Sequence, residues 1–245
     1  MVLVMDVAVW PLGASLPKRL AIGFNALRIL QYEPDHPVQG PLFEWCLDNG
    51  VQKKLAVKMR QTEVGSRLIA QRPTLQGPDL DLSALRAMPD GTLGREFARY
   101  FEKNGIQPFR TTFAIDSDDV YLAKRYRETH DLLHVITGYA THFLGEMELQ
   151  AFVLGNLGLP SAAMILVFSL GIRFQVAGFR EWSAYLKRLR VAYRRGARSK
   201  MMLDVEFEKR WLQPVSQVTA ELCAESEPVP EITVGIHQPP KPTTA

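Results

Sequence analysis

Cysteine is scarce in this sequence, and its scarcity limits the classes of protein that the chain can belong to. Only Cys46 and Cys223 occur among 245 residues, and neither forms a C-x-x-C pair. A disulfide-rich scaffold and a cysteine zinc site are therefore not expected. Glycine-rich phosphate loops, G-x-S-x-G motifs, internal repeats and the two-residue alternation of strands are also missing. The net charge of +3 is too small to indicate nucleic acid binding.

An unbroken hydrophobic run long enough for a membrane span is missing as well. Residues 149–172 contain no charged side chain in 24 positions, but Gly155, Gly158 and Pro160 interrupt them. We therefore predict two buried helices joined by a turn rather than one span. The N-terminus begins with apolar residues, yet it lacks a preceding basic region and is a poor secretory or mitochondrial signal.

Helical spacing of apolar residues is what the sequence does contain. Hydrophobic residues make up 47% of the chain, enough for one large core. We predict an all-α fold with about eight to ten helices. A single compact domain is expected over residues 1–225, followed by a flexible, proline-rich tail over 226–245. The expected helices cover residues 16–33, 42–71 with a break near Gly65, 83–88, 92–104 closed by Gly105, and a segment starting at Ser117.

A basic amphipathic helix is expected over residues 180–200. Its apolar residues follow helical spacing, and no acid occurs from Lys187 to Lys200 among several cations. A peripheral membrane surface or a phosphate group would attract such a helix, although an ordinary exposed helix can have the same pattern. RNA is less favoured because no stacking platform or known RNA module accompanies it.

The most informative segment is HDLLH at residues 130–134, followed by Glu146. On a helix that advances about 100° per residue, His130, Asp131 and His134 project from one side. An unbroken helix would carry Glu146 about 18 Å beyond His134, so the chain has to turn between them. We expect the turn at Gly138 and Gly145, with Thr141 as the N-cap of a second helix that returns Glu146.

Four such side chains at one point would suit a divalent metal. Imidazole binds zinc, iron and nickel, and carboxylates neutralise charge, while the open positions favour catalysis over a structural role. Two alternatives remain. The histidines of a bare HDxxH can be satisfied within a core, and an HD-type metal phosphohydrolase shares the motif. The second alternative needs a further upstream histidine, and only His36 is available, in a proline-bounded loop.

The HDxxH, eleven residues, E pattern resembles the signature of the fourth coenzyme Q (ubiquinone) biosynthesis protein family, and the similarity covers about residues 15 to 224. Phe207 and Thr219 depart from it, because a tryptophan and an arginine are expected there. The supporting matches are Arg72-Pro73, Thr92-Leu93-Gly94, Pro108, Arg110, Tyr126 to Thr129, Gly196, and the spacing of Glu208, Trp211 and Pro214.

The resemblance implies a role in making coenzyme Q or a related prenylquinone. It implies a metal at His130, Asp131, His134 and Glu146, with zinc favoured and iron(II) as the alternative. We expect a metal-dependent lyase that decarboxylates carbon one of a polyprenylated hydroxybenzoate, with Asp131 or Glu146 managing the proton. The competing hypothesis is a non-catalytic scaffold that binds isoprenoid lipid and organises a quinone-biosynthesis complex.

The same resemblance sets the expected partners and location. The partners are a polyprenylated quinone precursor or isoprenoid lipid, a membrane surface and other quinone-biosynthesis enzymes, without nucleic acid. A homodimer is compatible with the sequence. Because a mitochondrial leader is not evident, we expect a bacterial protein of the cytoplasm, peripheral to the inner membrane.

Overall fold

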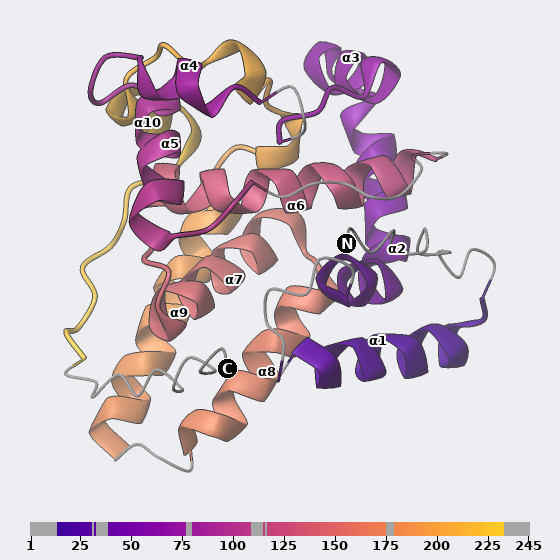
Figure 1. Ribbon diagram of the computed structural model, residues 1–245. Coiled ribbons are helices and arrows are strands. Elements are labelled where there is room, and N and C mark those ends of the chain that lie inside the picture. Colours follow the sequence, from indigo (N-terminus) through magenta and orange to yellow (C-terminus); the bar gives the residue numbers. More distant parts are fainter. Residues whose placement is uncertain are drawn as a thin grey trace, which may run out of the picture.

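A computed structural model describes residues 14–30, 32, 39–76, 80–108, 115, 117–174 and 179–232. The predicted features at His36, Arg110 and 233–245 lie outside these ranges. The described residues form ten α-helices and two short 3-10 helices, and no strand (Figure 1). Their bounds are α1 Leu16–Leu30, α2 Gln39–Met59, α3 Glu63–Gln71, α4 Leu82–Arg86, α5 Leu93–Asn104, α6 Asp118–Thr137, α7 Phe143–Leu157, α8 Pro160–Phe174, α9 Phe179–Arg198, η1 Met202–Asp204, η2 Phe207–Lys209 and α10 Val215–Leu222. The all-α prediction is confirmed.

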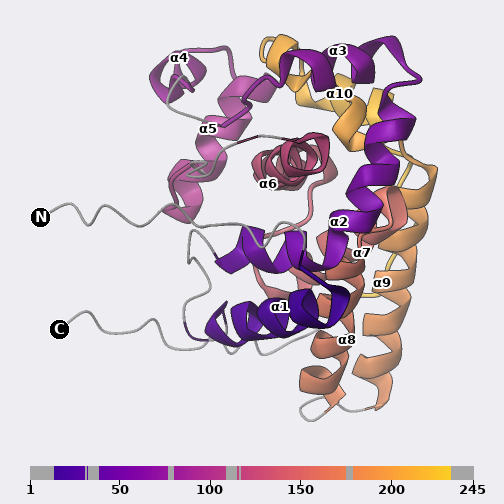
Figure 2. The same cartoon turned by 90° about the vertical axis from the view of Figure 1, so that its right-hand side faces the viewer.

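Helix α6 lies at the centre of the molecule. Figure 2 looks nearly along its axis and shows α5, α3, α10, α2 and α7 arranged around it. This position explains why 15 of the residues from Asp118 to Thr137 are buried, including polar ones, and why α6 has no exposed polar face. A helix surrounded in this way can present side chains to a buried site.

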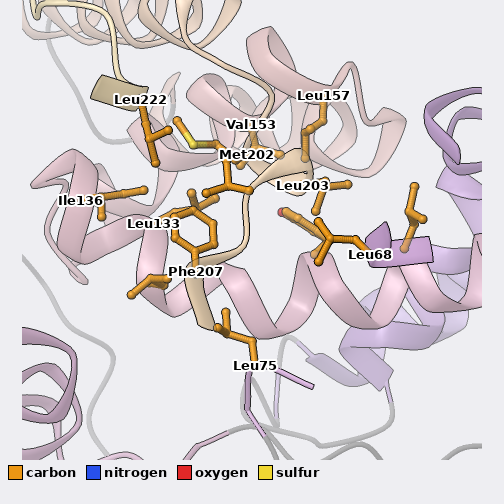
Figure 3. Packing of buried hydrophobic residues seen from close by; sticks show 14 of the residues in the cluster. Leu68, Leu75, Leu133, Ile136, Val153, Leu157, Met202, Leu203, Phe207 and Leu222 are labelled. Carbon is orange, nitrogen blue, oxygen red and sulfur yellow. The ribbon is translucent and has the colours of Figure 1, made fainter. Parts of the chain in front are cut away.

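The main core packs against α6. Figure 3 shows Leu133 and Ile136 of α6 among residues from the two 3-10 helices, α7 and α10. Phe207, where the family resemblance predicts tryptophan, is completely buried in this cluster. Thr219, where arginine was expected, donates a hydrogen bond from Oγ1 to the carbonyl oxygen of Ile136 at 2.8 Å. Both departures therefore still contribute contacts to α6.

The segment after α9 fixes the start of α5. Thr92 caps α5 as predicted, accepting from the N–H of Arg95, and Gly105 ends the helix in the left-handed conformation. The N–H of Gly94 donates to the carbonyl oxygen of Trp211 at 2.9 Å, and the Trp211 ring stacks on Phe97 with centroids 5.7 Å apart. The C-terminal part of the domain thereby sets the position of α5.

The predicted break near Gly65 is wrong in its position. Helix α2 ends at Met59 and α3 begins at Glu63, with Gly65 inside α3. Thr62 is the N-cap of α3, because its side chain accepts from the N–H of Gly65. A Cβ at Gly65 would lie 2.3 Å from the carbonyl oxygen of Met59, so the glycine permits the close approach of the two helices.

The uncharged stretch forms two helices, α7 and α8, as predicted. Gly158 ends α7 with φ +69, and Pro160 begins α8. No described helix combines the length and the hydrophobicity needed to cross a bilayer. The prediction that both helices are buried is wrong for α8, since Val167 and Phe168 are 65% and 41% exposed.

The first residues of the predicted tail contact α9. The carbonyl oxygen of Pro230 accepts from Arg188 at 3.0 Å, Glu227 pairs with Arg198, and Ile232 packs against a small cluster that includes Tyr185. Residues 233–245 lie outside the described residues, so the flexibility of the tail stays a prediction.

Candidate metal centre

The turn between α6 and α7 returns the chain to the same place, as the spacing of the motif predicts. Gly138 ends α6 in the left-handed conformation (φ 77) and donates its N–H to the carbonyl oxygen of His134. The predicted N-cap at Thr141 is wrong, because His142 caps α7 by accepting at Nδ1 from the N–H of Gly145. Thr141 instead donates to the side-chain oxygen of Asn104 at the end of α5.

Three of the four predicted ligands meet at one point. Nε2 of His130 lies 3.8 Å from Oε2 of Glu146, and Nε2 of His134 lies 3.1 Å from Oε1 of the same carboxylate. The two imidazole rings have centroids 5.2 Å apart and are nearly perpendicular, at 77°. One ligand atom from each residue lies within 4.8 Å of the others. A small shift of the side chains would bring all three atoms to bonding distance of one shared cation.

The hydrogen bonding of His134 fits a metal ligand. Its Nδ1 lies 2.9 Å from the carbonyl oxygen of Tyr139 and can only donate there, so the proton of the neutral ring is on Nδ1. Nε2 then carries a lone pair, is buried, and faces Oε1 of Glu146 at 3.1 Å. A lone pair that faces a carboxylate oxygen needs a cation or a proton between them. The residues present therefore fit a divalent metal.

The electrostatics of the group lead to the same requirement. Burial alone would lower the pKa of His134, but the Glu146 carboxylate raises it above its usual value. Burial would raise the pKa of Glu146, and the imidazoles of His134 and His130 hold it below its usual value instead. The carboxylate is thus ionised at neutral pH and favours a positive charge beside it.

Asp131, the fourth predicted ligand, lies outside this group. Its carboxylate is 3.5 Å from Nδ1 of His130, on the side of the ring away from Glu146, and accepts from Nε2 of Gln76 at 3.2 Å. Burial would raise the pKa of Asp131, but His130, Arg127 and Gln76 keep it below its usual value. A carboxylate at the second nitrogen of a ligating histidine typically fixes the orientation of the ring. Direct metal binding by Asp131 stays a prediction.

Two residues of the site were not expected from the sequence. Gln76 is completely buried, and its Nε2 also donates to the carbonyl oxygen of Glu128 at 2.6 Å. Tyr100 belongs to the same helix as Phe97 and Phe101, which are buried in the core, but the Tyr100 ring stacks on His134, with centroids 5.6 Å apart. The Tyr100 hydroxyl also donates toward Asp131 at 3.5 Å.

A buried ion pair holds the loop that carries Gln76. Lys124 and Glu128 are 2.6 Å apart on α6, and their side chains are 5% and 0% exposed. Glu128 accepts from the N–H of Leu75 at 3.1 Å, and Lys124 donates to the hydroxyl of Thr74 at 3.1 Å. The loop after α3 is thereby fixed to α6 one turn before the site.

Arg195 of α9 holds the other side of the site. Its Nη1 donates to the carbonyl oxygen of Thr137 at 2.8 Å, and its guanidinium lies over the Tyr139 ring, 5.5 Å from the centroid. Because the Tyr139 carbonyl accepts from His134, Arg195 stabilises the backbone that orients this histidine. The imidazole is therefore supported by both α5 and α9.

Fold and site together define a helical protein with a partly buried two-histidine, one-glutamate centre suited to a divalent metal. Residues 49–228 match the model of the coenzyme Q (ubiquinone) biosynthesis protein Coq4 family, and the chain belongs to this family, which is involved in ubiquinone biosynthesis. The resemblance inferred from the HDxxH and glutamate pattern is confirmed.

Individual relatives agree with this assignment. The chain is 37% identical over 180 residues to the mitochondrial ubiquinone biosynthesis protein COQ4 homolog of Danio rerio, covering 72% of this chain and 65% of the relative. It is 32% identical over 192 residues to the Mus musculus homolog, covering 77% and 66%. The matched part thus spans slightly less than two thirds of these relatives.

A solved structure has the same fold. The crystal structure of a candidate ubiquinone biosynthesis protein from Nostoc punctiforme PCC 73102 superposes with a TM-score of 0.67 at 24% sequence identity. The similarity covers 84% of this chain and 96% of the other. At this level of identity, the comparison supports the helical architecture alone.

Proposed function

We propose that the protein is a metal-dependent lyase that removes the carboxyl group at carbon one of a polyprenylated hydroxybenzoate. The observation that carries the proposal is the partly buried group of His130, His134 and Glu146, in which Nε2 of the buried His134 faces Oε1 of Glu146 at 3.1 Å. These three residues would hold zinc, or iron(II) as the alternative. The bound ion would supply Lewis-acid polarisation of the head group.

The reaction requires a proton as well as a charge acceptor. When the bond between ring and carboxylate breaks, carbon dioxide leaves, the electron pair stays on the ring carbon, and a proton has to reach that carbon. Asp131 and Glu146 are both ionised at neutral pH, so either would first take a proton from solvent water and then deliver it to the ring carbon. Burial raises the pKa of Tyr100, which therefore keeps its O–H directed toward Asp131.

The family and the setting of the site both support this substrate class. The ligands lie between α6 and α7, and α7 continues into the uncharged stretch that forms α8. The apolar side chains of the uncharged stretch, which begins at Leu149, would suit a prenyl tail. We propose that such a substrate, or another isoprenoid lipid, is taken from a membrane surface in cooperation with other quinone-biosynthesis enzymes.

The test is turnover of a substrate labelled at the carboxyl carbon. Zinc-loaded and iron(II)-loaded protein should release labelled carbon dioxide from the polyprenyl hydroxybenzoate, and Glu146→Gln should abolish release. If neither metal form releases carbon dioxide, the lyase proposal is wrong. A scaffold that only binds lipid and partner enzymes would retain both kinds of binding in Glu146→Gln.

A further inference from the structure

The cations of α9 divide into two groups according to what they contact. Arg188 donates to Glu148 on α7 at 2.7 Å, and Arg195 reaches the end of α6. Lys187, Arg190 and Arg194 are exposed and form no ion pair within the described residues. The first group connects α9 to the neighbouring helices. The positions of the three cations in the second group are not explained by contacts within the fold.

The second group forms one continuous face. At about 100° per residue, Lys187, Arg190 and Arg194 lie within an arc of roughly 60°. Residues three and four apart on a helix are neighbours, so these like charges repel one another and destabilise the isolated helix. Helix α9 has one acidic residue, Glu181 in its first turn, so no acid of α9 lies beside them. An anionic partner would relieve this repulsion.

Apolar side chains border the cations. Leu186 is 40% exposed and Tyr193 is 46% exposed, and both occupy the adjoining arc of roughly 60°. A helix that lies in a lipid interface combines these features, with Lys and Arg among the headgroups and aliphatic and aromatic side chains inserted below them. A phosphate backbone of nucleic acid would use the cations but would leave the exposed Leu186 without a partner.

Helix α9 is packed closely against the helix that carries Glu146 (Figure 1). A Cβ at Gly155 of α7 would lie 2.1 Å from the carbonyl oxygen of Tyr193, and a Cβ at Gly196 would lie 2.0 Å from that of Phe152. The two backbones therefore touch, with glycine at both contacts. A surface bound by the outer side of α9 would lie one helix layer from α7.

We infer that the outer face of α9, defined by Leu186, Lys187, Arg190, Tyr193 and Arg194, binds the anionic surface of a phospholipid bilayer. The inference rests on the proposed function, in that it names the surface from which a prenylated substrate is taken. It does not depend on the chemistry at the metal site, since none of the five side chains belongs to that site.

The test measures binding to vesicles of phosphatidylcholine with and without phosphatidylglycerol. The full chain should bind the vesicles that contain phosphatidylglycerol, and binding should weaken as salt rises. Each cation near an anionic surface contributes roughly a fivefold gain, so K187Q/R190Q/R194Q should weaken binding about 100-fold. The matched control K53Q/K54Q/K58Q removes three exposed cations from α2 and should bind like the parent protein. L186S/Y193S should also weaken binding at unchanged net charge.

Several outcomes would overturn the inference. Equal losses in the α9 and α2 variants would mean that only net charge matters, and unchanged binding by the α9 variant would place the contact elsewhere. Binding to poly(U) without binding to vesicles would identify a nucleic acid surface instead. Turnover of detergent-solubilised substrate by K187Q/R190Q/R194Q separates the two proposals. Carbon dioxide release from this substrate tests the lyase proposal alone, and vesicle binding tests the membrane contact alone.

Discussion

Gly145 lies against the carbonyl oxygen of Ala140, so closely that a Cβ at this position would be 2.1 Å from that oxygen. The contact closes the turn between α6 and α7 and sets the first turn of α7, where Glu146 follows directly. No side chain larger than hydrogen fits here unless the backbone moves. The position of a metal ligand thus depends on a neighbour that carries no functional group.

Gly145→Ala should therefore displace Glu146. We expect a loss of roughly 1–3 kcal/mol in the free energy of unfolding from overpacking, and weaker zinc binding, measured by urea denaturation and by competition with a chelator. Gly50→Ala is the control, because a Cβ there would meet nothing within 4 Å and Gly50 lies inside α2. This control should be stabilised by about 0.5–1 kcal/mol. Unchanged zinc affinity in Gly145→Ala would show that the turn does not position Glu146.

Asp131 and Glu146 should differ in their effect on zinc affinity. If Asp131 acts by orienting His130, Asp131→Asn should weaken zinc binding by about 10–100-fold. Glu146→Gln removes a ligand-type oxygen from the group and should weaken it further. Competition with a chromophoric chelator measures both, and circular dichroism confirms that each variant is folded. A larger loss in Asp131→Asn would make Asp131 a direct ligand, as the family resemblance predicts.

The buried pair of Lys124 and Glu128 should be sensitive to removal of one partner. Burial lowers the pKa of Lys124 and raises that of Glu128, so each charge depends on the other. Lys124→Met leaves Glu128 buried without its cation and should cost about 3–5 kcal/mol. Adding Glu128→Gln should recover part of this loss. As a surface control, Arg60→Gln breaks the exposed pair with Asp118 and should cost less than about 1 kcal/mol.

Local signals were sufficient to predict most of the helices. Thr92 and Gly105 delimit α5, and Gly138 ends α6, because caps and left-handed glycines act within one turn. The break after α2 was misplaced at Gly65, although Thr62 is itself an N-cap residue and could have indicated the start of α3. The glycine serves close packing there, which local sequence does not reveal.

The metal ligands were predictable because they come from one helix and the next turn of chain. Gln76 and Tyr100 were not, because they reach Asp131 from 55 and 31 residues away. Gln76 lies in a segment that resembles a simple connector, and Tyr100 shares its helical face with core phenylalanines. Their roles depend on how α5 and the loop after α3 pack on α6, and no local pattern encodes that packing.

The stability of the protein should depend on pH because Asp48 is buried. Its side chain is completely buried between α2 and α8, where it accepts from the N–H of Ser161 at 2.8 Å and from the Ser161 hydroxyl at 2.6 Å. Burial raises the pKa of Asp48 to about 7, against the effect of these hydrogen bonds, and nearby Glu44 adds to the rise. The folded protein therefore keeps a proton that the unfolded chain releases near its ordinary pKa of about 4.

The sign follows from proton linkage. Between about pH 4 and pH 7 the folded state binds more protons than the unfolded state, so the contribution of Asp48 to stability falls as pH rises. The total change is at most about 4 kcal/mol. Asp48→Asn removes the titration while its amide can still accept from the Ser161 N–H and donate to its hydroxyl. Urea unfolding of both proteins at each pH cancels the contributions of other groups. The variant should gain stability relative to the parent as pH rises from 4 to 7, and a difference that does not change with pH would show that Asp48 is ionised throughout this range.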